Sequence, residues 1–203
     1  MLGILGGTFD PIHFGHLRPA LEVFEALGLD ELRFIPLRDP PHRERPGATP
    51  EQRLAMVELA VAGQPGFRVD DQELNREGKS FTLYTLRALR EERGGDEPIC
   101  LLLGTDAYTQ FATWHRPEEI MELAHLVVMQ RPVEPIEAHY PQRMAENADE
   151  LHASPGGRIL FQPVTQIAIS STEIRALIRE DRSPRWLLPD RVLAYIGQQG
   201  LYR

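Results

Sequence analysis

This chain of 203 residues lacks several features that would assign it to a special class of protein. Cys100 is its only cysteine, which excludes an internal disulfide and favours a reducing, cytoplasmic setting. No apolar run is long enough to span a bilayer and no secretory signal is recognisable, so we expect no membrane contact. The formal net charge of −8 argues against a general nucleic-acid binder, which usually carries an excess of basic residues.

Cysteine and lysine each occur once. Cys100 lies in the apolar run 99–103, so we predict that it is a small buried hydrophobe rather than a nucleophile. Lys79 is the only lysine, and nearly all positive charge is therefore carried by arginine.

The sequence is compatible with a homo-oligomer and does not fix the oligomeric state.

Short apolar runs alternate with amphipathic stretches along the whole chain. Pro19 falls inside the first helical pattern, so that helix either starts later or is kinked. Residues 132–157 mix proline, charge and glycine, which predicts a surface excursion with some helix. The patterns predict strands at 2–5, 32–36, 67–69, 98–104, 124–130 and 158–162, and helices at 14–27, 49–62, 81–92, near 118–121, 171–180 and 189–199.

This alternation predicts the α/β class: a doubly wound, mostly parallel, Rossmann-like sheet with helices appended at the C-terminus. We expect a single domain over residues 1–203, because no repeat or low-complexity segment interrupts the pattern. In such sheets ligands bind at the carboxyl ends of strands, near the point where the strand order reverses. The first strand usually flanks that point, so the residues after it are expected to lie where a ligand binds.

The stretch that follows the first strand reads "GGTFDPIHFGH" over residues 6–16. Gly6 and Gly7 permit close approach of a ligand, and the helix that begins near His13 offers N–H groups and a partial positive charge to an anion. His13 and His16 are three residues apart and share a helix face, so both can donate hydrogen bonds to phosphate oxygens. A zinc site is a weaker alternative because no third ligand lies nearby in the sequence, and we expect no protein-bound metal.

A second stretch with the same chemistry reads "ISSTEIR" over residues 169–175. Ser170 and Glu173 form a capping-box pattern, which by itself predicts only a well-started helix. The hydroxyls and N–H groups at that helix start would also receive an anion, and Arg175 lies one turn further along with a planar, charged fork. The two stretches together predict a phosphate clamp.

The first stretch resembles the T/HxGH signature of the nucleotidyltransferase superfamily, and in that superfamily the ISSTxIR segment closes over a triphosphate opposite the histidines. The resemblance implies that His13, His16 and Arg175 are catalytic, acting by positioning and charge stabilisation rather than as bases. It also implies a set of ATP-binding residues, namely Gly6, Gly7, Thr8, Phe9, His13, His16, Gly104, Asp106, Arg131, Ile169, Ser170, Ser171 and Arg175. For Asp106 a helix cap is an alternative, and Arg131 is a candidate for the adenine or phosphate side.

Further matches, "PPHR" at 40–43, "SFTLYTL" at 80–86, "GTDAYTQFATW" at 104–114 and the C-terminal "LLPDRVLAYIGQQGLY", resemble bacterial nicotinate-nucleotide adenylyltransferases along almost the whole chain. Trp114 offers a flat face to a pyridinium ring, although a core tryptophan is an alternative. Thr82, at a helix start, could recognise a carboxylate. His115 stands where relatives often have an aromatic residue. The mononucleotide-binding residues implied are Thr8, His42, Arg43, Ser80, Thr82, Thr85, Trp114 and His115, with solvated loop charges as the alternative for His42 and Arg43.

The resemblance implies adenylyl transfer from ATP to nicotinate mononucleotide, with Mg²⁺ carried by ATP, in NAD biosynthesis. ATP and the mononucleotide are the expected partners, without nucleic acid or membrane. Alternatives are a related adenylyltransferase for nicotinamide mononucleotide or another phosphorylated substrate, and a noncatalytic nucleotide-binding sensor on the same fold.

Overall fold

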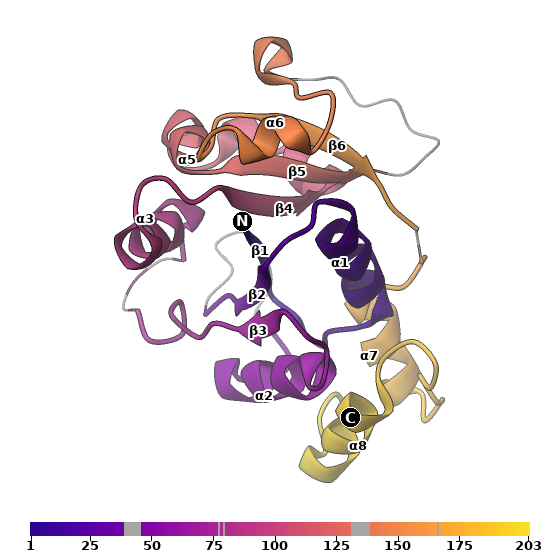
Figure 1. The fold of residues 1–203 in the computed structure, drawn as a ribbon. Helices are drawn as coiled ribbons and strands as arrows, with labels where there is room; N and C mark the ends of the chain where they lie inside the picture. Colours follow the sequence, from indigo (N-terminus) through magenta and orange to yellow (C-terminus); the bar gives the residue numbers. More distant parts are fainter. Residues whose placement is uncertain (39–45, 77, 79, 131–138, 166) are drawn as a thin grey trace. The chain divides into compact units, whose positions relative to one another are not determined.

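The computed structural model describes residues 1–38, 46–76, 78, 80–130, 139–165 and 167–203. Within them, six strands form one sheet in the order β3-β2-β1-β4-β5-β6 (Figure 1). The strands are β1 (Leu2–Gly7), β2 (Glu31–Pro36), β3 (Phe67–Val69), β4 (Ile99–Gly104), β5 (His125–Gln130) and β6 (Ile159–Pro163).

The helices follow the strands along the chain, and all six predicted helices are present. Residues 105–109 and 111–113 are also helical, although a loop is expected there, because turns this short carry no periodic signal. Helix α1 begins at Phe14 and contains Pro19, so the helix does not start later as one alternative had it. The helices are α1 (Phe14–Ala26), α2 (Pro50–Val61), α3 (Thr82–Arg93), α4 (Thr105–Thr109), α5 (Pro117–Leu123), α6 (Asp149–His152), α7 (Ser171–Arg179) and α8 (Asp190–Gln199), with 3₁₀ turns η1 (Phe111–Thr113) and η2 (Pro141–Arg143).

The strand order confirms the doubly wound, Rossmann-like prediction. Strands β1, β4, β5 and β6 pair in parallel, with Ile4 opposite Leu101 and Leu102 opposite Val127. Continuous apolar runs such as β4 are typical of parallel strands that are covered on both faces. The order reverses between β1 and β4, which is the position that the sequence predicts for a ligand-binding edge.

Contacts divide the chain into two compact units. Unit 1 comprises residues 1–5, 20–33 and 81–165, and its core includes Leu2, Ile99, Leu126 and Ile159. Unit 2 comprises residues 6–19, 34–80 and 166–203, and its core includes Phe9, Ile12, Phe34, Met56 and Ile174. Strands β1 and β2 contribute residues to both units. The single domain expected from the sequence stays a prediction.

The buried residues of unit 1 correct one expectation and confirm another. In the described part of 132–157, Leu151 and Ala145 are buried, and Met144 pairs with Ile159 in an isolated parallel β-bridge. The expectation that this segment lies on the surface is therefore wrong for part of it. Its short helical pieces, η2 and α6, were expected. Cys100 is fully buried, its Sγ lies 3.4 Å from Met1 Sδ, and burial raises the pKa of its thiol to about 12. This confirms a packing role rather than a nucleophile.

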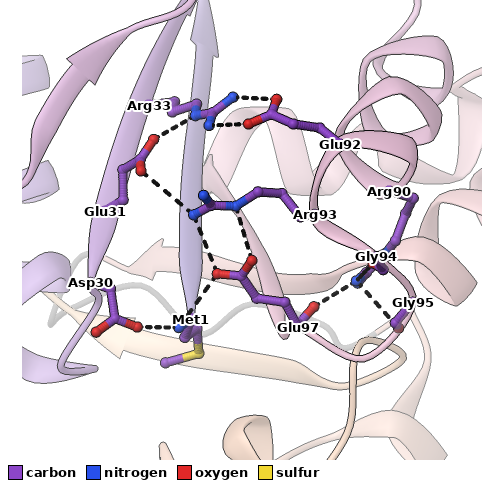
Figure 2. A network of polar contacts seen from close by, with 10 residues as sticks. All are labelled: Met1, Asp30, Glu31, Arg33, Arg90, Glu92, Arg93, Gly94, Gly95 and Glu97. Carbon is purple, nitrogen blue, oxygen red and sulfur yellow. Dashed lines mark hydrogen bonds and ion pairs between the residues drawn. The ribbon is translucent and has the colours of Figure 1, made fainter.

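Unit 1 also holds a network of charged side chains (Figure 2). Arg33 makes a two-pronged contact with the Glu92 carboxylate, at 2.8 and 2.6 Å. Arg93 lies between two further carboxylates, with Nε 2.9 Å from Glu97 and Nη2 3.5 Å from Glu31. Arg90 instead donates to carbonyl oxygens.

None of the helices in the described residues is long and apolar enough to cross a bilayer.

Candidate active site

The motif loop, residues 8–13, connects the end of β1 to α1 within unit 2, and three distant side chains hold its carbonyl groups. Arg53 Nη1 donates to Thr8 O at 2.7 Å, and Arg175 Nη1 donates to Asp10 O at 2.7 Å. Ser171 Oγ donates to Pro11 O at 2.9 Å. Because two of these donors come from α7, the ISSTEIR stretch lies directly against the motif loop, as the clamp hypothesis requires.

Arg53 is the buried end of this arrangement. Its side chain is fully buried in α2, and Nη2 donates to Arg38 O at 2.9 Å. Burying a guanidinium is costly unless its donors find acceptors, and these two hydrogen bonds tie the loop after β2 to the motif loop. Helix α2 is itself well started, with Thr49 and Gln52 forming a reciprocal capping box.

The two histidines lie face to face at the start of α1. Their ring centroids are 3.8 Å apart with an interplanar angle of 29°, and the His13 backbone N–H donates to His16 Nδ1 at 3.4 Å. An accepting Nδ1 requires His16 to carry its proton on Nε2 in this geometry. His13 is 5% exposed, and burial lowers its pKa from 6.5 to about 4. His13 is therefore neutral near pH 7 in the unliganded protein.

The start of α1 offers an anion fewer N–H groups than the sequence predicts. The Phe14 N–H donates to Leu187 O at 3.0 Å, and the His13 N–H is directed to His16. The first turn carries no acidic residue, so the partial positive charge of the helix terminus is uncompensated there. The favourable field remains, but two of the expected donors are occupied.

The glycines of the motif have different roles from one another. A Cβ at Gly6 would meet nothing within 4 Å, so this exposed position leaves room for a ligand. A Cβ at Gly7 would lie 2.7 Å from the Phe9 ring, and at Gly15 it would lie 2.9 Å from His13 Nδ1 and 3.2 Å from Ile169 O. Gly6 and Gly7 are strand residues without positive φ, so space rather than an unusual backbone shape explains them. Gly15, which the sequence did not single out, permits the close approach of α1 to Ile169.

Phe9 is buried, with 2% exposure, and its ring packs on His16 at 5.3 Å and on Phe34 at 6.2 Å between centroids. Its backbone φ is 50°, in the left-handed region that a bulky residue rarely adopts. Such strain persists where the surroundings enforce it, commonly at functional sites. Any contact of Phe9 with ATP would come from its backbone.

The start of α7 confirms the expected cap. Ser170 Oγ accepts from the Glu173 N–H at 3.1 Å, and Ser170 is exposed. Arg175 is one turn further, 24% exposed, with Nη2 3.4 Å from Thr172 Oγ1. Its other end is held by Asp10, whose carboxylate Oδ2 lies 3.5 Å from Nη1. Unit 2 therefore brings together Thr8, Phe9, His13, His16, Ile169, Ser170, Ser171 and Arg175.

Gly6, Gly7 and Ser80 also belong to unit 2, and unit 1 holds the other predicted site residues that the structure describes. Gly104 ends β4 and precedes α4, and Asp106 is exposed in the first turn of α4. Gly104, not Asp106, is at the N-cap, and no side chain caps this helix, so the cap alternative for Asp106 is wrong. Thr82 is the first residue of α3, as predicted, and Thr85 is buried on the same helix.

Aromatic side chains gather beside α3 in the same unit. His115 is exposed and stacks on Phe81, with centroids 4.5 Å apart at 25°, and Tyr84 lies 6.0 Å away. Trp114 is half-buried and contacts Phe111 at 5.5 Å between centroids, so it is not a core tryptophan. Ser80 is buried at the edge of unit 2. His42, Arg43 and Arg131 lie outside the described residues.

Comparison with known proteins identifies the family. A family model described as Cytidylyltransferase-like matches residues 4–177. A protein of Methylococcus capsulatus named "Probable nicotinate-nucleotide adenylyltransferase" is 48% identical over 209 residues, covering 100% of this chain and 99% of that protein. The chain belongs to the nicotinate-nucleotide adenylyltransferase family.

Other members of the nicotinate-nucleotide adenylyltransferase family agree with this assignment. A protein of the same name from Pseudomonas fluorescens is 48% identical over 207 residues, covering 100% of this chain and 97% of that protein. The solved structure "Plasmodium falciparum nicotinic acid mononucleotide adenylyltransferase complexed with NaAD" is similar, with a TM-score of 0.75, 15% identity, and coverage of 99% and 96%. The structural likeness supports the fold. The family is one of nucleotidyltransferases, so this chain is a transferase.

Three supporting residues of this nicotinate-nucleotide adenylyltransferase family member were missed by sequence reasoning: Asp10, Arg53 and Tyr202. Asp10 stands inside the quoted motif and Tyr202 inside the C-terminal match, so a signal was available for both. Arg53 lies in a predicted amphipathic helix, where an arginine is normally assigned to the solvent face.

Proposed function

We propose that this chain transfers the adenylyl group of ATP to nicotinate mononucleotide, forming deamido-NAD and releasing pyrophosphate. The observation that carries the proposal is the packing of His13, His16 and the α7 start around one loop, with Arg175 donating to Asp10 O. Two helix N-termini, a guanidinium and two imidazoles in one place form a strong receptor for phosphate. The 48% identical relatives carry the corresponding name.

The proposed step is an in-line displacement at phosphorus. An oxygen of the mononucleotide 5′-phosphate forms a bond to the α-phosphorus of ATP. The bond from that phosphorus to the oxygen bridging to the β-phosphorus breaks, and pyrophosphate leaves with the electron pair. A phosphate monoester has a second pKa of about 6, so the nucleophile is largely a dianion at neutral pH and needs no general base.

The side chains of unit 2 would stabilise charge in this step. Neutral His13 can donate a hydrogen bond but brings no positive charge of its own. Its Nδ1 packs against Gly15 and has no partner among the described residues, which leaves Nε2 as the atom that we assign to the ligand. Arg175 supplies full positive charge, and the α1 and α7 termini supply partial charge. Positioning and charge neutralisation are the proposed basis of catalysis.

ATP is proposed to enter as its Mg²⁺ complex. Mg²⁺ is commonly held by substrate phosphates together with few protein groups. Within the described ranges, no group of three or more His, Cys, Asp or Glu side chains could hold a metal ion. The Asp10 carboxylate, within the motif loop, is already contacted by four donors. The residues therefore fit a metal that arrives with ATP better than one held by the protein.

The substrate assignments in the rest of the chain belong to the same proposal. Trp114 would stack on the pyridinium ring, because its side chain is only partly buried. Thr82 and Thr85 would favour the nicotinate carboxylate. The proposed ATP contacts are those given from the sequence, with Gly104 and Asp106 near the ribose. A single domain and a cytoplasmic location also stay predictions.

A substrate panel tests the proposal. Purified protein with Mg-ATP is mixed in turn with nicotinate mononucleotide, nicotinamide mononucleotide and phosphopantetheine, and pyrophosphate release is measured. Nicotinate mononucleotide is expected to give the largest kcat/KM, and His16→Ala is expected to lower its turnover about 10²-fold, as loss of a preorganised donor does. A larger kcat/KM with another acceptor would identify that acceptor as the substrate instead. Absence of pyrophosphate release with all three acceptors would favour a nucleotide sensor.

A further inference from the structure

Asp10 is a buried carboxylate with donors on both oxygens. Oδ2 accepts from the Gly47 N–H at 2.8 Å and lies 3.5 Å from Arg175 Nη1. Oδ1 accepts from the Ala48 N–H at 3.1 Å and from the Tyr202 hydroxyl at 2.7 Å. A carboxylate has about four lone-pair sites, so these four donors fill its capacity. Asp10 is thus the point at which three separate segments of unit 2 meet.

The orientation of Arg175 depends on this carboxylate. Its Nη1 lies between Asp10 O, at 2.7 Å, and Asp10 Oδ2, at 3.5 Å. Its Nη2 lies 3.4 Å from the hydroxyl of Thr172, an exposed residue. One end of the planar guanidinium is therefore tied to Asp10, and that contact limits how the other end meets a ligand.

Tyr202 reaches Asp10 because of how α8 ends. Gly200 has φ 62°, and the Leu201 N–H returns to Ile196 O at 3.1 Å. Tyr202 then has φ 66°, a left-handed conformation that is uncommon for an aromatic residue. A Cβ at Gly47 would lie 3.0 Å from its ring, so the ring packs closely on that glycine. Burial raises the pKa of the hydroxyl, which keeps it protonated and a donor.

Charge compensation connects these contacts to function. A triphosphate and the Asp10 carboxylate compete for Arg175 because both are anions. The three neutral donors on Asp10 spread its negative charge and weaken its hold on the guanidinium. Removal of the Tyr202 hydroxyl would leave Oδ1 with one donor, and Asp10 would then draw Arg175 closer.

We propose that Tyr202 is a positioning residue, whose hydroxyl acts through Asp10 to keep Arg175 oriented toward the ATP phosphates. This inference rests on the proposed function. Tyr202 touches neither substrate in it, so its effect is transmitted entirely by the carboxylate. The expected signature is a loss confined to the ATP half of the reaction.

The first experiment is Tyr202→Phe, which keeps the ring against Gly47 and removes only the hydroxyl. The kcat/KM for ATP is expected to fall about tenfold, the order of one hydrogen bond to a charged group, while the KM for nicotinate mononucleotide changes less than twofold. Tyr195→Phe on α8 is the matched control, because Tyr195 is half-buried on the same helix, and its kinetics are expected to equal wild type. Wild-type ATP kinetics for Tyr202→Phe would overturn the inference.

A double-mutant cycle separates positioning from simple structural loss. ATP affinity is measured by calorimetry for wild type, Tyr202→Phe, Arg175→Ala and the double variant. With Arg175 absent, Tyr202→Phe is expected to change affinity less than twofold, and equal losses in both backgrounds would refute the coupling. If wild type transfers no adenylyl group, the proposed function fails, while these affinities still decide the coupling. If Tyr202→Phe does not fold, Gly47→Ala displaces the ring instead and is expected to give the same ATP-specific loss.

Discussion

Burial decides what His13 can contribute as a single residue. A surface histidine next to phosphate would be a partly charged donor near neutral pH. His13 has 5% exposure and lies against the His16 ring at 3.8 Å, and burial lowers its pKa to about 4. Two stacked imidazoles would repel each other if both were protonated. A neutral His13 suits a site that has to receive several phosphates and then release a product.

The His13 pKa predicts an acid-sensitive folded state. The folded pKa of about 4 lies below the unfolded value of 6.5, so between these values the unfolded chain binds a proton that the folded chain does not. The contribution is fully present above pH 6.5 and is lost as the pH falls toward 4. The linkage relation gives a loss of about 2 kcal/mol from this group at pH 5 relative to pH 7.5.

The measurement is the urea unfolding free energy at both pH values for wild type and His13→Asn. The wild-type difference between the two pH values is expected to exceed that of His13→Asn by about 2 kcal/mol. The buried His125, whose pKa is also lowered by burial, is present in both proteins and cancels. His115→Asn is the control because it replaces an exposed histidine in the other unit and leaves His13 in place. Equal pH dependence for wild type and His13→Asn would contradict the assignment.

The chemical role of a residue could be predicted from the sequence only where its partners are close to it in the sequence. The motif loop and the α7 start could be recognised because each is a short run with its own phosphate chemistry. The partners of Asp10 could not, since Tyr202 is 192 residues away in sequence and Ala48 is 38 residues away. Arg53 gave a misleading signal because its Nη1 and Nη2 donate to two carbonyls that only the folded chain brings together.

At the scale of elements, Gly15 lets α1 and the α7 segment approach each other. A Cβ there would lie 2.9 Å from His13 Nδ1 and 3.2 Å from Ile169 O, and both neighbours belong to the clamp. Alanine normally stabilises a helix interior relative to glycine by about 1 kcal/mol. At Gly15 that gain is offset by the displacement of His13 or of Ile169.

We therefore expect opposite outcomes when alanine replaces glycine at position 15 and at position 197. Gly197 lies in α8 with nothing within 4 Å of an added Cβ, so Gly197→Ala should raise the unfolding free energy by about 0.5–1 kcal/mol at unchanged turnover. Gly15→Ala should give no such gain and lower turnover at least tenfold, because small displacements of positioning groups are costly. Unfolding in urea and steady-state kinetics measure both. Wild-type turnover in Gly15→Ala would show that the close approach is dispensable.

The elements themselves follow from hydrophobic periodicity, and their arrangement does not. Every predicted strand is present within two residues of its expected bounds. Apolar runs such as 99–103 are recognisable because parallel strands are buried on both faces of the sheet. The strand order and the registers depend on contacts between distant segments. The helix α6 was only partly anticipated, since four residues are too few for a periodic signal, and its buried Leu151 is visible only in the fold.

At the scale of the whole molecule, the proposed ligand-binding residues of unit 1 and its network of charged side chains lie at opposite ends of the strands. Gly104 and Asp106 follow the carboxyl end of β4. Glu97 precedes the amino end of β4, and Glu31 begins β2, so the network of Figure 2 belongs to the amino ends of the strands. Ligands in such sheets bind at the carboxyl ends, which leaves the amino ends free for stabilising contacts.

Arg90 is the member of this region expected to matter most for stability. Its Nε and Nη2 donate to Leu123 O at 2.9 and 2.6 Å, and Nη2 also donates to Pro155 O at 2.7 Å. Its Nη1 donates to carbonyls of the segment after α3, at 2.5 Å for Glu97 (Figure 2). Burial lowers the pKa of this guanidinium, but arginine keeps its charge in proteins. One side chain thus joins the ends of α3 and α5 to the chain near Pro155.

Arg90→Met is expected to lower the unfolding free energy by about 3 kcal/mol, because several carbonyls lose a charged donor at once. Arg87→Met is the matched control, one turn earlier on α3, where an exposed arginine pairs with Glu119. An exposed ion pair contributes about 0–1 kcal/mol, and high salt should remove that small effect while leaving the Arg90 loss. Urea unfolding in low and high salt measures both. Similar losses for the two variants would mean that Arg90 acts as an ordinary surface charge and that the carbonyl groups find water instead.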